Sequence, residues 1–101
     1  MTTANIRKVL VQYDEYLRPF VPVRDVSQPK SYMRWMCCQA ISMLDVANSY
    51  SGHREVRSEM IEQANRWLGF IQGVLWTTGE FTIDQMREHN YEPKQPQMAR
   101  V

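Results

Sequence analysis

A single Ser-Gly step divides the long proline-free part of this sequence. Residues 30–78 contain no proline, and apolar residues on both sides of Ser51-Gly52 recur three or four positions apart. That spacing places apolar side chains along one side of an α-helix. A glycine at such a step is typical of the left-handed residue that ends a helix. The sequence therefore predicts two long helices, 29–51 and 54–78, which fold back on each other as an antiparallel hairpin.

Two shorter helices are predicted outside the hairpin. Apolar residues at helical spacing, followed by Pro19, predict an amphipathic helix over 3–18. Thr82 and Gln85 match the capping box that begins a helix, which predicts a short helix over 83–89. The predicted fold class is all-α, with the two shorter helices packed on the hairpin.

The predicted helices form one domain over residues 1–90. The tail over 91–101 contains two prolines and little to bury, so we expect it to be flexible. The connector over 19–30 contains three prolines, which exclude a long helix there. Four apolar residues of this connector are expected to lie on the core: Phe20, Val21, Val23 and Val26.

Bulky and small residues alternate in the second half of the hairpin. Trp35 and Gly69 are equally far from Gly52 in sequence, so we expect the indole to pack against Gly69, with Gly73 extending the same notch. Further aromatic residues on this helix give it a large apolar surface. The two short helices are not long enough to be expected to bury all of it. Self-association through that surface predicts a homo-oligomer, a dimer or higher. The alternative is that the short helices and the connector cover it.

Composition limits the classes of partner. Twelve basic and eleven acidic residues leave a net charge of +1. Proteins that bind nucleic acid usually carry a basic excess, so direct binding to nucleic acid is not expected. The uncharged runs are shorter than the about 20 apolar residues that span a bilayer, so no membrane segment is expected. The N-terminal residues lack the apolar core of a signal peptide, so the expected location is the cytoplasm.

Few residues could carry catalysis or hold a metal. Cys37 and Cys38 are adjacent, so on a helix their side chains diverge by about 100° and cannot easily bind one ion together. His53 lies beside the hairpin turn and His89 lies near the end of the last helix, away from both thiols. We therefore expect two reduced thiols, no metal, no cofactor and no catalytic residue.

Arginine and aromatic residues form the one arrangement that could bind a small ligand. Arg34-Trp35 and Arg66-Trp67 lie on the two helices of the predicted hairpin, and such pairs can clamp a nucleobase and a phosphate. The competing interpretation is that the tryptophans belong to the core while the arginines reach solvent. A nucleotide site would comprise Arg34, Arg66, Trp67, Gln72 and Trp76.

A second set of residues is expected on the surface of the hairpin. The first half of the 54–78 helix is heavily charged, which is typical either of a solvated face or of an edge that binds a partner. The second half adds aromatic residues to that surface. The predicted partner-binding or oligomer surface consists of Arg54, Arg57, Phe70 and Trp76.

Residues 65–90 carry a distinctive pattern. They read NRWLGFIQGVLW and, after a short break, TIDQMREHN, with Trp35-Met36-Cys37 upstream. The pattern resembles small accessory proteins encoded by tailed bacteriophages and prophages, which carry an RWLGFxQGxLW segment followed by a TIDxxRxxN helix. The resemblance covers roughly a third to a half of the chain and transfers no catalytic residue. It implies a phage protein made in the bacterial cytoplasm; such proteins often act by binding, and some counter host defence.

Two functions follow as expectations. The first is a non-enzymatic phage accessory protein that binds a host bacterial protein, such as a defence component, and inhibits it. The alternative is an oligomeric sponge that sequesters a small nucleotide signal at the arginine–tryptophan site. A regulator of transcription is a third and weaker candidate, because the near-neutral charge and the lack of a helix-turn-helix pattern disfavour contact with DNA.

Overall fold

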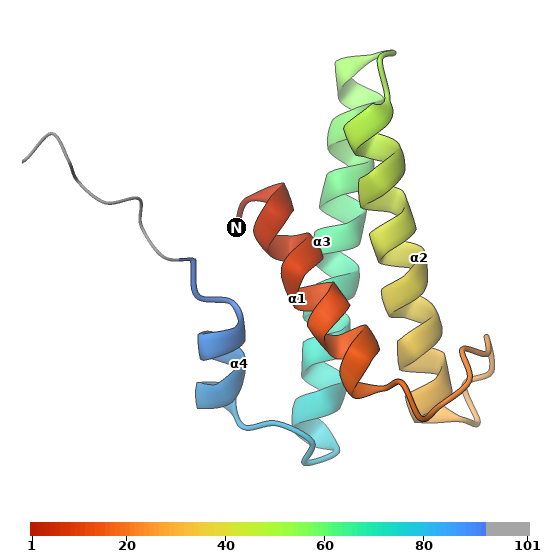
Figure 1. Cartoon of the computed structure of the whole chain (residues 1–101), viewed down its shortest axis with the longest axis vertical. Coiled ribbons are helices and arrows are strands. Elements are labelled where there is room, and N and C mark those ends of the chain that lie inside the picture. The colour runs from red at the N-terminus through yellow and green to blue at the C-terminus, as the bar shows by residue number, and fades with distance from the viewer. Residues whose placement is uncertain (93–101) are drawn as a thin grey trace, which may run out of the picture.

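The protein is all-helical over the residues that the structure describes. The computed structural model describes residues 1–92 and contains, in chain order, α1 (Thr3–Tyr16), α2 (Pro29–Ser49), α3 (Arg54–Thr77) and α4 (Ile83–His89). The arrangement is shown in Figure 1. The predicted fold class is confirmed, and every predicted helix boundary lies within two residues of the observed one.

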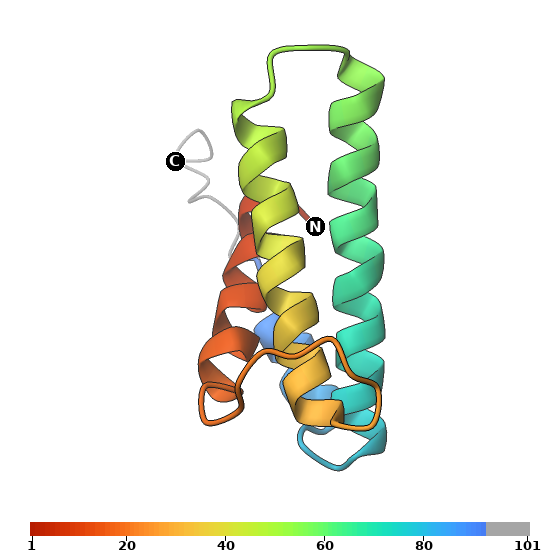
Figure 2. The same ribbon diagram turned by 90° about the vertical axis from the view of Figure 1, so that its right-hand side faces the viewer.

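The helices α2 and α3 form the antiparallel hairpin, and α1 packs along it (Figure 2). Their apolar sides meet in one core, and α2 packs against both α1 and α3, as expected of a central helix. Each fully buried aliphatic side chain there stabilises the fold by about 1.5–3 kcal/mol relative to an exposed one. The buried apolar residues of the core are Ile6, Val9, Leu10, Tyr13, Leu17, Met33, Met36, Cys37, Ala40, Leu44, Ala64, Leu68, Ile71 and Leu75.

Arg34 of α2 binds the chain at and just beyond the end of α1. Its Nε donates to Asp14 Oδ1 at 3.1 Å, and its Nη1 donates to the carbonyl oxygens of Arg18 and Phe20 at 3.0 and 2.9 Å. Pro19 lies between those two carbonyls and lacks the N–H that would continue a helix. The guanidinium therefore binds carbonyl groups that the end of α1 leaves without helical partners.

The ends of α3 and α4 follow from local sequence. Gly79 has a φ of 76°, and the N–H of Glu80 donates to the Leu75 carbonyl at 2.8 Å, which is the Schellman arrangement. Thr82 and Gln85 then form the predicted capping box, with both reciprocal hydrogen bonds present. These residues reverse the chain between α3 and α4.

The turn between α2 and α3 differs from the expectation. Gly52 was expected to be the left-handed end of α2, but Gly79 is the residue with positive φ among residues 1–92. The helix α2 already ends at Ser49, and Tyr50 is extended, so no left-handed residue is needed. A Cβ on Gly52 would overlap the outer end of the Tyr50 ring, which is partly exposed and would have to turn aside.

The expected contact between Trp35 and Gly69 is wrong. No atom lies within 4 Å of a Cβ built on Gly69, apart from its own helix and chain neighbours. Trp35 packs on Trp67 instead, with ring centroids 6.0 Å apart. Gly69 is two positions beyond Trp67, which turns it by about 200° around the helix and away from α2.

The connector between α1 and α2 is only partly packed. Phe20 lies against the core as expected, and Val23 is half-buried. Val21 and Val26 are 70% and 78% exposed, so the expectation that they lie on the core is wrong. The Arg34 contacts hold the chain near Phe20, and a turn closed by the Gln28 N–H and the Asp25 carbonyl carries Val26 outward.

A polar network attaches α4 to α1 and α3. The amides of Gln72 and Asn90 pair with each other at 2.7 and 3.3 Å, and Gln72 Nε2 also donates to Tyr13 Oη at 3.0 Å. Tyr13 Oη lies 2.8 Å from His89 Nδ1, and Asn5 donates to the Asn90 carbonyl. Since Tyr13 Oη accepts from Gln72, its proton is available for Nδ1 of a neutral imidazole.

The two ends of the described chain meet. The backbone N–H of Thr2 donates to Glu92 Oε1 at 2.9 Å, and Lys8 Nζ donates to the Tyr91 carbonyl at 3.2 Å. Both residues of the C-terminal side therefore lie against the start of α1. The rest of the predicted flexible tail, residues 93–101, lies outside the described residues.

The docking of α4 should depend on pH through His89. Burial lowers the pKa of His89 below its ordinary value of 6.5. A group with a lower pKa in the folded state binds protons more tightly when unfolded, so stability is full above about pH 6.5 and decreases as the pH falls through that value. Urea unfolding between pH 8 and 5.5 should show this decrease.

Two variants separate this effect from other titrating groups. His89→Asn keeps an acceptor near the Tyr13 hydroxyl but cannot gain a proton, so it should flatten the pH dependence. His53→Asn changes an exposed histidine at the start of α3 and should leave the dependence unchanged. An unchanged pH profile in His89→Asn would refute the assignment.

Candidate functional site

Among residues 1–92, nothing covers one side of α3 over its last three turns. Each residue on this side has another of the set three or four positions away, so they share one helix face, opposite the buried residues of the same helix. All of them are exposed. We call this surface the outer face of α3, and it consists of Arg66, Gly69, Phe70, Gly73, Trp76 and Thr77.

Two large aromatic side chains of the outer face stand in solvent. Phe70 is 56% exposed and Trp76 is 50% exposed. Trp76 also borders a shallow groove of about 430 Å³ with the α3–α4 loop and the start of α4, where Ile83 is 45% exposed. Single exposed apolar residues are ordinary, but several that adjoin one another are typical of an interaction surface.

The two glycines of the outer face make no close contact with other elements in the part of the chain that the structure describes. No atom beyond their own helix and chain neighbours lies within 4 Å of a Cβ built on Gly69 or on Gly73. Each glycine in a helix interior is about 0.8–1.0 kcal/mol less favourable than alanine. The fold would therefore be more stable with alanine at both positions, and no neighbour among residues 1–92 requires glycine there.

The first half of α3 carries charge in place of apolar surface. Arg66 Nη1 lies 3.9 Å from Glu62, and both side chains are about 70% exposed, so this pair contributes little to stability. Arg54 is exposed as predicted. Arg57 has an internal contact, since its Nε donates to the Ala47 carbonyl at 3.1 Å and binds the end of α2.

The five residues of the predicted nucleotide site are not gathered around one cavity. Arg34 binds Asp14 and the end of α1, while Gln72 binds Tyr13 and Asn90. Arg66 is on the outer face, where it pairs with Glu62. The groove beside Trp76 is lined by none of the other four residues.

Trp67 and Trp35 belong to an aromatic cluster at the side of the hairpin. The ring centroid of Trp35 lies 5.7 Å from that of Tyr32 and 6.0 Å from that of Trp67. The guanidinium carbon of Arg24, in the connector, lies 5.2 Å from the centre of the Trp35 ring. Sequence reasoning missed Arg24, because nothing in the connector's sequence indicates which ring it reaches.

Neither thiol is activated as a nucleophile. Burial raises the pKa of Cys37 to about 12, and burial together with the Asp14 carboxylate also raises the pKa of Cys38. Cys38 Sγ donates to Asp14 Oδ1 at 3.3 Å. Reactive thiols show the opposite shift, because the thiolate is the nucleophile. Both cysteines are free, as the sequence predicted.

The described residues show neither a metal-binding cluster nor a membrane-spanning helix. Within residues 1–92 no three histidine, cysteine or acidic side chains lie close enough to hold a metal ion. Over the same residues, no helix combines the length and the apolar character needed to cross a bilayer. Comparison of the chain with protein-family models, curated proteins and solved structures gave no match.

Replacing the outer-face glycines should stabilise the protein. Gly69→Ala and Gly73→Ala should each raise the free energy of unfolding by about 0.5–1 kcal/mol, because alanine has the higher helix propensity and nothing blocks its methyl group. Urea denaturation monitored by circular dichroism measures both changes.

Gly79→Ala provides the contrasting substitution. Space is also open at Gly79, but its φ of 76° is unfavourable for alanine, so this variant should lose about 1–2 kcal/mol. Destabilisation by Gly69→Ala or Gly73→Ala would show that these glycines serve the fold after all.

Proposed function

We propose that this protein is a non-enzymatic accessory protein of a tailed bacteriophage or prophage, which binds a host protein through the outer face of α3. The observation that carries the proposal is that Gly69 and Gly73 are exposed, have no neighbour that needs them, and adjoin exposed Phe70 and Trp76. The two glycines make the protein less stable than alanine would at the same positions. A helix face that carries them together with exposed aromatic rings is suited to binding another protein.

The chemistry of this face indicates a helix of the partner. Gly69 and Gly73 lie one turn apart, so the backbone of α3 is bare along a short strip. Small residues at this spacing let a second helix approach closely, and aromatic residues beside such a strip often carry much of the binding free energy. The proposed host protein therefore contributes an apolar helix to the outer face.

The bacterial setting of the proposal rests on the resemblance of residues 65–90 to phage accessory proteins. The proposed partner is a cytoplasmic protein of the host, such as a component of a defence system, whose activity would be blocked when its helix is occupied. The proposal assigns no catalytic step, and the raised pKa values of both thiols agree with that.

A second copy of the chain could occupy the same face, which is how the predicted homo-oligomer would form. In an antiparallel pair of α3 helices centred at the level of residue 71, Gly69 would face Gly73 of the second copy. Arg66 would then face Trp76, and a guanidinium over an indole ring contributes about 0.5–1 kcal/mol at an exposed site. Such a dimer would compete with the host protein.

The nucleotide sponge has less support from the contacts than binding to a host protein. Arg34 and Gln72 would have to leave their hydrogen bonds with α1 and Asn90 before they could hold a ligand. Arg66 remains available, but one exposed arginine gives little affinity for a phosphate group.

The proposal predicts that stability and binding change in opposite directions. The double variant Gly69→Ala, Gly73→Ala should be more stable than the wild type, yet should lose the host protein, because two methyl groups fill the strip on which the partner helix lies. Tagged protein recovered from bacterial cells would be assayed for captured protein by quantitative mass spectrometry, with an expected loss of at least about tenfold.

A matched control changes two exposed positions of α2. Gln39→Ala with Ser42→Ala also adds helix-favouring alanines, but away from α3, and should capture the partner as the wild type does. Native mass spectrometry of the same samples reports whether a second copy occupies the face. Equal capture of a host protein by wild type and the glycine double variant would exclude the outer face as its binding site.

A further inference from the structure

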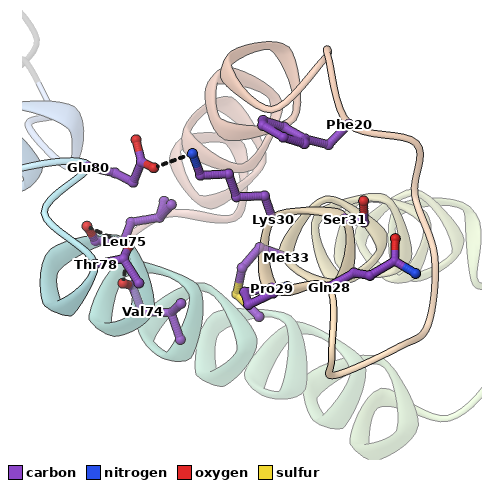
Figure 3. Close-up of a pocket in the computed structure, with 10 residues that line it drawn as sticks. All are labelled: Phe20, Gln28, Pro29, Lys30, Ser31, Met33, Val74, Leu75, Thr78 and Glu80. Carbon is purple, nitrogen blue, oxygen red and sulfur yellow. Dashed lines mark hydrogen bonds and ion pairs between the residues drawn. The ribbon is translucent and has the colours of Figure 1, made fainter.

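An apolar pocket lies at the end of the hairpin near the start of α2. Its volume is about 410 Å³, and its walls come from the first turns of α2, the last turns of α3 and the connector. Phe20, Met33, Val74 and Leu75 form apolar walls, as Figure 3 shows. The pocket lies on a different side of α3 from the outer face, so it is independent of the proposed binding to a host protein.

The volume of the pocket exceeds what one side chain needs. A cavity of about 150 Å³ already holds benzene, and pockets for small molecules usually measure about 300–1,000 Å³. A pocket of about 410 Å³ therefore has room for a ring together with a short alkyl chain. A single phenylalanine or leucine of a partner protein would leave much of it unfilled.

One ion pair lies at the mouth of the pocket. Lys30 Nζ lies 2.9 Å from Glu80 Oε1 and 5.1 Å from the centre of the Phe20 ring. In Figure 3 a dashed line joins the end of the lysine side chain to this carboxylate. The hydroxyl of Tyr16 donates to the other oxygen of Glu80, so the carboxylate is held from two sides.

The charges at the mouth select against an anion. The ammonium of Lys30 is already neutralised by Glu80, and a carboxylate or phosphate placed beside it would also face the Glu80 carboxylate. An ammonium has three N–H donors, so Lys30 can still donate to a neutral oxygen while it keeps its ion pair. The mouth therefore suits an uncharged acceptor such as a carbonyl group.

We propose that this pocket binds a small uncharged molecule whose apolar body fills the cavity and whose carbonyl oxygen accepts a hydrogen bond from Lys30. The apolar walls supply most of the affinity, since burial of apolar surface contributes about 25 cal/mol per Å². The hydrogen bond to Lys30 fixes the orientation and distinguishes a carbonyl compound from a hydrocarbon of the same shape.

Three probes of nearly equal size test the ligand class. Butyrophenone carries a carbonyl between a phenyl ring and a propyl chain, butylbenzene replaces that carbonyl by a methylene group, and 4-phenylbutyrate adds a carboxylate. Methyl NMR of the full chain would follow Met33, Val74 and Leu75 in the pocket, with Val9 and Leu10 of α1 as reference signals. Butyrophenone should shift the pocket signals and bind most tightly, and 4-phenylbutyrate should bind most weakly.

Variants test the location and the hydrogen bond. Val74→Phe fills the pocket from α3 and should weaken butyrophenone at least about tenfold. Thr78→Leu also fills the pocket, from an exposed position, and replaces Val74→Phe in the test if that variant does not fold. Val46→Phe, on the exposed side of α2, is the matched control. Lys30→Met should weaken butyrophenone about tenfold and leave butylbenzene unchanged, whereas Lys8→Met should change neither.

Four outcomes would overturn the proposal. The pocket signals could fail to shift with butyrophenone, or both filled variants could bind it as the wild type does. Equal or tighter binding of 4-phenylbutyrate would show that the ligand class is anionic. Release of a captured host protein by butyrophenone would assign the pocket to side chains of that partner.

Discussion

The contacts of Arg34 join the end of α1 to the central helix of the hairpin. The guanidinium binds Asp14 and two carbonyl groups just beyond the helix, and these bonds add to the apolar core that α1 shares with the hairpin. With α1 held there, Tyr13 is buried and its hydroxyl reaches Gln72 and His89. The position of α4 therefore depends on the position of α1.

This arrangement covers one side of α3 and leaves the other side bare. The α4 region packs against α1 at Tyr13, which contacts the rings of Phe81 and His89. The helix α2 packs along the core side of α3. The outer face is what remains, and there the sequence has two glycines that lower helix stability. Natural proteins commonly accept such losses where a binding surface requires them.

The parts of the fold that depend on residues close together in sequence could be predicted from the sequence. Helical spacing, Pro19 and the Thr82–Gln85 pair each act within a turn or two of the chain, and all three predictions are confirmed. The register of the hairpin could not be predicted, because it depends on which rings pack together. Trp35 meets Trp67, and that choice turns Gly69 outward.

The candidate site was predictable only in part, for a related reason. Phe70 and Trp76 are exposed, in keeping with the predicted surface, because they lie outside the buried stripe of Ala64, Leu68, Ile71 and Leu75. Inside the fold, the side chains of Arg34, Arg57 and Gln72 bind groups at the ends of other helices. Only the folded chain brings those groups within hydrogen-bonding distance. A polar residue on a helix does not indicate by its spacing whether its partner is a ligand or a carbonyl group.

The contact between Thr2 and Glu92 would allow the order of the helices along the chain to be changed by circular permutation. Because these residues touch, a short peptide could join them, and new ends could be opened at the exposed turn at residues 51–53. In such a circular permutant α3 and α4 would precede α1 and α2. The long hairpin would lose its covalent link, and α2 and α3 would have to find each other through the core alone.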